Sequence, residues 1–127
     1  MAAKVSLRLY SRDSSPARVT ARLGDGLTEP AGADAASGEH HSSRWARSWE
    51  CATVDGLGAA LAECDGFVSS HSEELTDLIG EGWRVDVIVN LRTLDGDALF
   101  AIEPAGLQAL AALRLRLNFL VLADGPP

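Results

Sequence analysis

The chain has 127 residues, a length typical of one domain that buries its own core without disulfide or metal cross-links. Its 18 acidic side chains outnumber its 11 lysine and arginine side chains, and the formal net charge is −7. Because nucleic acids and anionic membrane surfaces both attract basic proteins, this balance argues against either as a partner.

The sequence favours a cytoplasmic protein. Ser6, Arg8 and Arg12 interrupt the first apolar run too early for a signal peptide, and no segment reaches the roughly 18 apolar residues of a membrane helix. Two cysteines, Cys51 and Cys64, do not make a disulfide framework, so we expect two buried free thiols.

The first predicted elements are a strand and a short helix. Apolar and polar residues alternate over Val5–Tyr10, which is the period of a half-buried strand. Ser15 and Pro16 are typical of a helix start and Gly24 of a helix end, so a helix is expected over Ser15–Leu23.

Residues 24–43 are expected to form a long surface loop. They are rich in glycine, alanine, aspartate and serine, and they contain Pro30. Loops of this length are either functional or disordered, and composition does not distinguish the two. Glu39, His40 and His41 offer metal-ligand types, but adjacent residues need further ligands from elsewhere, so no metal site is predicted.

An extended segment over Trp45–Cys51 follows, and it places Trp45, Arg47 and Trp49 on one face. One interpretation is that the two indoles cover an end of the core. The other is that these three side chains form an aromatic platform beside the loop, on which a small ligand stacks.

Residues 55–82 have helical periodicity that breaks near the middle. Ser70 and Glu73 fit a capping box that restarts a helix, so one kinked helix and two consecutive helices both agree with the pattern.

The last third is expected to run strand, hairpin turn, strand, helix and strand, followed by a tail. An Asp-Gly pair between two strand patterns indicates the hairpin, and a proline at the first turn indicates the helix. These elements are, in order, Trp83–Arg92, Asp95–Gly96, Ala98–Ile102, a helix opened by Pro104, Arg114–Leu122 and the tail 123–127.

Together the elements predict a single α+β domain over residues 1–127, with a mainly antiparallel sheet of four to five strands and helices on one face. If the helix Ser15–Leu23 and the tryptophan strand are set aside as an insertion, the remaining order is that of a ferredoxin-like core. The two terminal strands are then central or paired, with Val87 and Leu117 buried.

No constellation in the sequence supports catalysis. The third histidine, His71, has no nucleophile in a recognisable motif beside it, and phosphate-binding glycine loops and zinc motifs are absent. We therefore predict no catalytic residue, no cofactor and no metal.

Acidic residues dominate the helical region. Eight acids and no lysine or arginine lie between Ser48 and Trp83. They either keep a face soluble or form a docking surface for a basic partner. The residues assigned to this acidic helical surface are Glu63, Asp65, Glu73, Glu74, Asp77 and Glu81. By contrast, Arg84, Arg92, Arg114 and Arg116 are interpreted as charges that limit stray sheet pairing.

The order of these pieces resembles a bacterial family catalogued as domain of unknown function 4279. The residues that carry the resemblance are the strand Val5–Leu9, the helix Pro16–Gly24, the glycine-bearing polar loop and the tryptophan strand at Trp49–Cys51. The helical region and the final elements complete it. The resemblance implies a small stand-alone bacterial domain without established catalytic residues.

Three function classes follow, in order of preference. The first is a non-catalytic binding module that acts through protein–protein contacts and regulates or neutralises a basic partner, as an immunity protein does. The second is a small-ligand sensor that uses Trp45 and Trp49. The third is an enzyme. Homo-oligomerisation is compatible with all three.

Overall fold

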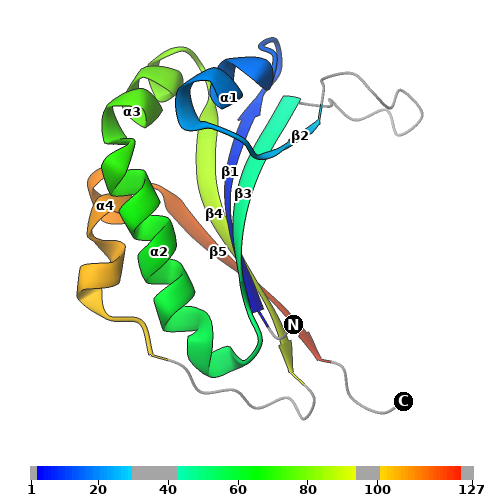
Figure 1. Ribbon diagram of the computed structural model, residues 1–127, viewed down its shortest axis with the longest axis vertical. Coiled ribbons are helices and arrows are strands. Elements are labelled where there is room, and N and C mark those ends of the chain that lie inside the picture. The colour runs from blue at the N-terminus through cyan, green and yellow to red at the C-terminus, as the bar shows by residue number, and fades with distance from the viewer. Residues whose placement is uncertain (1–2, 30–42, 94–100, 124–127) are drawn as a thin grey trace.

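Five strands and four α-helices make up the part of the chain that the computed structural model describes, residues 3–29, 43–93 and 101–123 (Figure 1). The α+β class is therefore as predicted. The elements are β1 (Ala3–Ser11), α1 (Ala17–Leu23), β2 (Leu27–Glu29), β3 (Ser43–Cys51), a 3-10 turn (Val54–Gly56), α2 (Leu57–Ser70), α3 (Ser72–Gly80), β4 (Arg84–Thr93), a second 3-10 turn (Pro104–Leu107), α4 (Gln108–Ala112) and β5 (Arg116–Ala123).

β1 lies at the centre of the sheet, whose strand order is β2-β3-β1-β4-β5. β1 pairs antiparallel with β3 and with β4, and β2 pairs antiparallel with β3. β5 pairs parallel with β4. The sheet is therefore mixed, with its two terminal strands in different places: β1 is central, and β5 lies at an edge.

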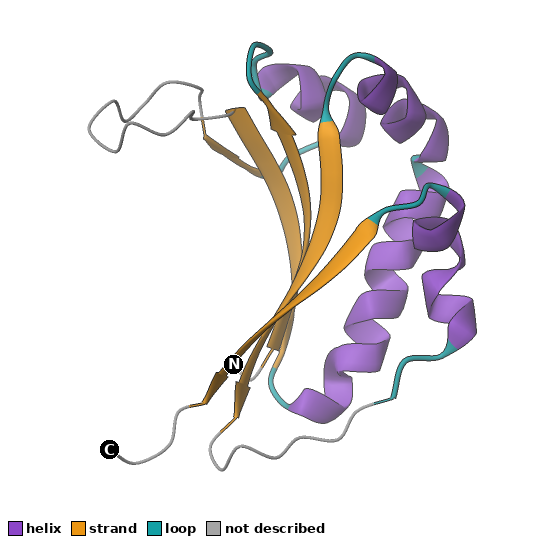
Figure 2. Ribbon diagram, turned by 180° about the vertical axis from the view of Figure 1, so that it is seen from behind, coloured by secondary structure: helices purple, strands orange, loops and turns teal. Residues whose placement is uncertain are grey.

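The α-helices lie on one face of the sheet (Figure 1). The sheet curves away from them, so that its other face, which we call the open face, is concave (Figure 2). Strand residues alternate between the two sides: Val5, Leu7 and Leu9 are fully buried, whereas Lys4 and Arg8 are partly exposed on the open face. The helices complete the core with Val19, Leu57, Leu61, Val68, Leu75 and Leu78.

The tryptophan strand and the first helix are integral parts of this core, so their interpretation as an insertion is wrong. β3 pairs with β1 from Ser43 to Cys51. α1 buries Val19 and Leu23 against the same core. Removing either element would expose apolar surface of the core, so both belong to the folded unit.

The predicted loop over residues 24–43 contains a strand. Leu27–Glu29 forms β2 and pairs with Ala46, Trp45 and Arg44 of β3. Three residues are too few for a periodic pattern to predict. Residues 30–42, which include Pro30 and both loop histidines, lie outside the described residues.

The predicted return strand over Ala98–Ile102 is not supported where the chain is described, because residues 101–103 have no regular structure. The Asp95–Gly96 turn lies outside the described residues. Both sides of β4 are occupied, one by β1 and the other by β5. A parallel neighbour needs a crossover connection, and the second 3-10 turn and α4 lie in that connection.

The helical region forms two helices, α2 and α3, that meet at His71. Ser70 ends α2 and does not cap α3, whose N-cap position is His71 without a side-chain cap. The imidazole of His71 instead stacks on Phe67 at 4.2 Å, and its Nδ1 lies 2.9 Å from the Phe67 carbonyl oxygen. These contacts attach the residue between the two helices to the last turn of α2.

Burial of the strand residues agrees with most of the sequence pattern. Val87 is fully buried as predicted, whereas Leu117 is only partly buried because β5 is an edge strand. Cys51 and Cys64 are free and buried, as predicted. None of the helices in the described ranges is long and apolar enough to cross a membrane.

Candidate functional site

The residues predicted to form one acidic helical surface have different environments. Glu63, Glu73 and Asp77 are exposed, and Glu74 is partly exposed. Asp65 is 7% exposed and belongs to the core. The surface is therefore smaller than the sequence suggests.

Asp65 serves the fold rather than a surface, so its assignment to the acidic helical surface is wrong. Its Oδ1 accepts hydrogen bonds from the backbone N–H groups of Ala109 at 2.9 Å and Leu110 at 3.0 Å. These are N–H groups of the first turn of α4, which have no partner inside the helix. Asp65 lies beside Cys64 on the apolar side of α2, and this position in the sequence pattern could have indicated that it is buried.

Glu81 joins α3 to α1. Its Oε1 accepts a hydrogen bond from Arg18 Nε at 2.6 Å, and its Oε2 forms an ion pair with Arg22. The hydrogen bond from Arg22, followed by that from Arg18, lowers the pKa of the Glu81 carboxyl. Its charge is already compensated within the chain, which makes it a weak candidate for attracting a partner.

The proposed aromatic platform loses Trp45. This indole is fully buried, and its Nε1–H donates a hydrogen bond to the Gly24 carbonyl oxygen at 3.3 Å. Gly26 lies so close that an added Cβ would be 2.6 Å from the indole. Trp45 therefore covers the core, as the first interpretation of the tryptophan strand predicted.

Trp49 and Arg47 remain near the surface, packed over the end of α2. The Arg47 guanidinium lies 4.9 Å from the Phe67 ring centre and 5.9 Å from that of Trp49. The Trp49 and Phe67 rings meet edge to face at 5.8 Å. Phe67 and Arg47 therefore both contact the indole, so part of the surface that a ligand would stack on is already used within the chain.

Positive charge gathers on the open face, although the chain as a whole is acidic. Strand alternation and register put six lysine and arginine side chains there, with Glu50 and Asp86 as the carboxylates among the described side chains. The six are Lys4, Arg8, Arg44, Arg84, Arg92 and Arg116.

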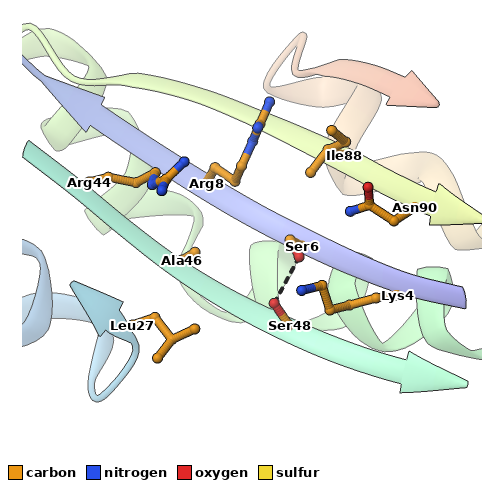
Figure 3. Close-up of a pocket in the computed structure, with 9 residues that line it drawn as sticks. All are labelled: Lys4, Ser6, Arg8, Leu27, Arg44, Ala46, Ser48, Ile88 and Asn90. Carbon is orange, nitrogen blue, oxygen red and sulfur yellow. Dashed lines mark hydrogen bonds between the residues drawn. The ribbon is translucent and has the colours of Figure 1, made fainter. Parts of the chain in front are cut away.

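The middle of the open face is hollowed into a shallow cavity of about 280 Å³, which we call the sheet groove (Figure 3). Its floor consists of small side chains, and the hydroxyls of Ser6 and Ser48 share a hydrogen bond of 2.8 Å. Larger side chains from four strands surround them. The residues of the sheet groove are Lys4, Ser6, Arg8, Leu27, Arg44, Ala46, Ser48, Ile88 and Asn90.

A second cavity, of about 520 Å³, lies where β4 and β5 begin and β1 ends, and we call it the arginine pocket. Its residues are Tyr10, Arg84, Val85, Asp86, Arg114 and Arg116. The sequence pattern put Arg84 on one strand and Arg114 with Arg116 on another, without bringing the two strands together. Parallel pairing of β4 with β5 does so, because it puts Asp86 beside Arg116. The strand placement of Arg114 is wrong, because β5 begins at Arg116 and Arg114 lies in the turn before it.

Asp86 is the hydrogen-bond centre of the arginine pocket. Its carboxylate accepts two hydrogen bonds from Arg8 at 2.9 Å each, one from the Tyr10 hydroxyl at 3.2 Å and one from Asn118 at 3.3 Å. Burial, together with the charge of Asp86, raises the pKa of Tyr10 to about 12, so the phenol stays neutral. Partial burial lowers the pKa of Arg8, but the hydrogen bonds to Asp86 and its negative charge raise it by more, so the pKa of Arg8 is raised overall.

Among the described residues, no group of three or more histidine, cysteine, aspartate or glutamate side chains is arranged to hold a metal ion. Burial raises the pKa of both thiols, that of Cys64 to about 12, which keeps them in the unreactive protonated form. Neither thiol is therefore suited to act as a nucleophile at neutral pH.

Comparison of the chain with protein-family models, with curated proteins and with solved structures finds no match.

Proposed function

We propose that the chain is a non-catalytic binding module that acts through protein–protein contacts, and that its partner docks on the open face. The observation that carries the proposal is a concave sheet face on which none of the described helices lies and on which positive charge is concentrated in an otherwise acidic protein. The partner segment that fits is extended and acidic, since complementary charge speeds association and excludes basic competitors.

Apolar side chains beside these cations support a protein as the partner. Leu27 is 76% exposed, and Leu120 and Leu122 are 45% and 41% exposed. Arginine mixed with exposed apolar groups is typical of protein interfaces.

For the architecture, we propose a ferredoxin-like core that differs from the one expected from sequence. The elements β1, α1, β2, β3, α2 and β4 run strand, helix, strand, strand, helix, strand. Their strand order, β2-β3-β1-β4, with antiparallel pairing throughout, supports this proposal. β5 is an addition outside β4. We also propose that the chain is a bacterial, cytoplasmic protein of the domain of unknown function 4279 family.

A second candidate is the contact with a basic partner through the acidic helical surface, in the manner of an immunity protein. Glu63, Glu73 and Asp77 support it, because they are exposed and have no ion-pair partner among the described residues. Asp65 and Glu81 do not contribute to this contact, because Asp65 is buried as the cap of α4 and Glu81 is paired with Arg18 and Arg22.

Paired charge reversals test the two candidates against each other. One variant carries Lys4→Glu and Ser48→Glu in the sheet groove, and the other carries Glu73→Lys and Asp77→Lys on α3. Proteins captured by the wild-type chain are identified by mass spectrometry, and the association rate of each purified candidate is then measured at two salt concentrations.

Docking on the open face predicts slower association for the groove variant and unchanged association for the α3 variant. The reverse result would establish the second candidate. A partner whose association neither variant changes would contradict both, provided that each variant melts at the wild-type temperature.

A further inference from the structure

The arginine pocket collects cationic side chains from two strands that are distant in sequence. Arg84 is the first residue of β4, and Arg116 is the first residue of β5. Since β4 and β5 are parallel, their first residues meet at the same end of the sheet. Arg114 reaches the same cavity from the turn that joins α4 to β5.

These three arginines have no internal anion. Among the described residues, Arg84, Arg114 and Arg116 form no ion pair. The one carboxylate that lines the pocket, Asp86, is already paired with Arg8 through two hydrogen bonds. The cavity therefore holds a net excess of positive charge within a protein whose overall charge is negative.

The backbone at Arg114 is a second and independent observation. Its φ angle is +56°, and it is the one non-glycine residue in the described ranges with a positive φ. Arg114 ends α4 in the position that glycine usually takes. Its own N–H donates a hydrogen bond to the Ala111 carbonyl oxygen, and the N–H of the next residue, Leu115, donates to the Leu110 carbonyl oxygen. Glycine would adopt this conformation at lower cost, so an arginine here stabilises the fold less than the alternative would.

We propose that the arginine pocket binds the phosphate group of a small organic phosphate. A carboxylate carries one charge and two acceptor oxygens, which satisfy one guanidinium fork. Three guanidinium groups match an anion with about two charges and three acceptor oxygens, which is a phosphate monoester. The cavity volume of about 520 Å³ lies in the range of small-molecule sites. This site is separate from the sheet groove, so it does not depend on the docking of a protein there.

Titration calorimetry of the whole chain in phosphate-free and sulfate-free buffer tests the proposal, with glycerol 3-phosphate as the probe. Sodium acetate at equal ionic strength is the carboxylate control, inorganic phosphate reports on the bare group, and a single-stranded oligonucleotide reports on a polyanion. The variants are Arg114→Gly and Arg116→Gln, and Lys4→Gln is a matched control that removes one cation from the open face outside the pocket.

We expect saturable binding of glycerol 3-phosphate that each pocket variant weakens about tenfold, the effect of one lost charged hydrogen bond. Lys4→Gln should leave the affinity unchanged. Arg114→Gly should bind less well while melting at the same temperature as the wild type or higher, because glycine removes the positive-φ cost. A fold defect would lower the affinity and the melting temperature together, whereas loss of a phosphate contact lowers the affinity alone.

Inorganic phosphate that binds as tightly as the organic probe would support phosphate recognition and assign it to the free ion. Equal binding of acetate would overturn the proposal, as would affinity unchanged in both pocket variants. An oligonucleotide that binds more tightly than glycerol 3-phosphate in a salt-dependent manner would overturn the small-molecule assignment.

Discussion

The carboxylate of Asp65 accepts a hydrogen bond of 3.0 Å from the backbone N–H of Leu110, and so ties the middle of α2 to the first turn of α4. α4 has five residues, and its N-cap residue is Leu107, which has no side-chain oxygen to accept these bonds. Asp65 supplies the missing cap from another helix.

Asp65→Ala is expected to lower the free energy of unfolding by about 2–3 kcal/mol, because one buried and one partly buried N–H group of α4 lose a charged acceptor. Glu63→Ala, an exposed neighbour on the same helix, should change it by no more than about 0.5 kcal/mol. Urea denaturation measures both. Equal and small effects would mean that Asp65 belongs to the exposed acidic surface after all.

The two tryptophans of β3 should differ in their contributions to stability. Trp45 is fully buried, so Trp45→Ala is expected to cost about 3–5 kcal/mol of unfolding free energy. Trp49 is partly buried, and Trp49→Ala should cost less. Chemical denaturation followed by circular dichroism makes the comparison. A Trp45→Ala protein of wild-type stability would restore the ligand-platform hypothesis that its burial argues against.

Glu81 and its exposed neighbours on α3 offer a pH test. Because the pKa of Glu81 is lowered in the folded state, its stabilising effect is present at neutral pH and is lost as the pH falls through the lowered value. Glu81→Lys should lower the melting temperature at pH 7 and reduce its fall between pH 5 and pH 3. Glu73→Lys with Asp77→Lys should leave the melting temperature at pH 7 within a few degrees of the wild type. Melting curves of both variants between pH 3 and pH 7 measure these effects, and equal melting temperatures for the two variants would contradict a special role of Glu81.

Cys64 predicts a loss of stability at alkaline pH. Burial, and then the charge of Asp65, raises its pKa to about 12, whereas a free thiol ionises near 8.5. The unfolded chain therefore loses a proton that the folded chain keeps, and stability falls as the pH rises above about 9, by at most about 1.4 kcal/mol per pH unit.

Cys64→Ala is expected to be less stable at pH 7 because of lost packing, but to show a shallower fall between pH 9 and pH 11 than the wild type. Tyr10, whose pKa is also raised to about 12, contributes a further fall above pH 10 that the variant keeps. Denaturation at several alkaline pH values measures the two slopes, and identical slopes would show that the thiol is already accessible to solvent.

Periodicity predicted most elements of this fold because they are long and amphipathic. β1 alternates over nine residues, and α2 and α3 each bury one apolar side. Two parts were beyond such patterns. β2 is three residues long, and the parallel position of β5 depends on where the chain crosses rather than on any local signal.

The candidate sites were harder to predict than the fold, because charge counting does not say which side of the molecule a charge lies on. Six acids of the helical region were assigned to one surface, yet the fold uses Asp65 as a cap and Glu81 as a link between helices. Arg84 and Arg116 lie on separate strands, and their proximity depends on the register of a parallel pair.

β5 is bound on one side only, since it pairs with β4 and no described strand lies along its other edge. Its side chains from Phe119 to Leu122 are each 41–58% exposed, so little apolar burial holds it in place. Such a strand opens as a local unit at a lower free energy than the central β1. Amide hydrogens of β5 should therefore exchange with solvent before those of β1. Because Arg116 begins this strand, a ligand held in the arginine pocket is expected to slow that exchange.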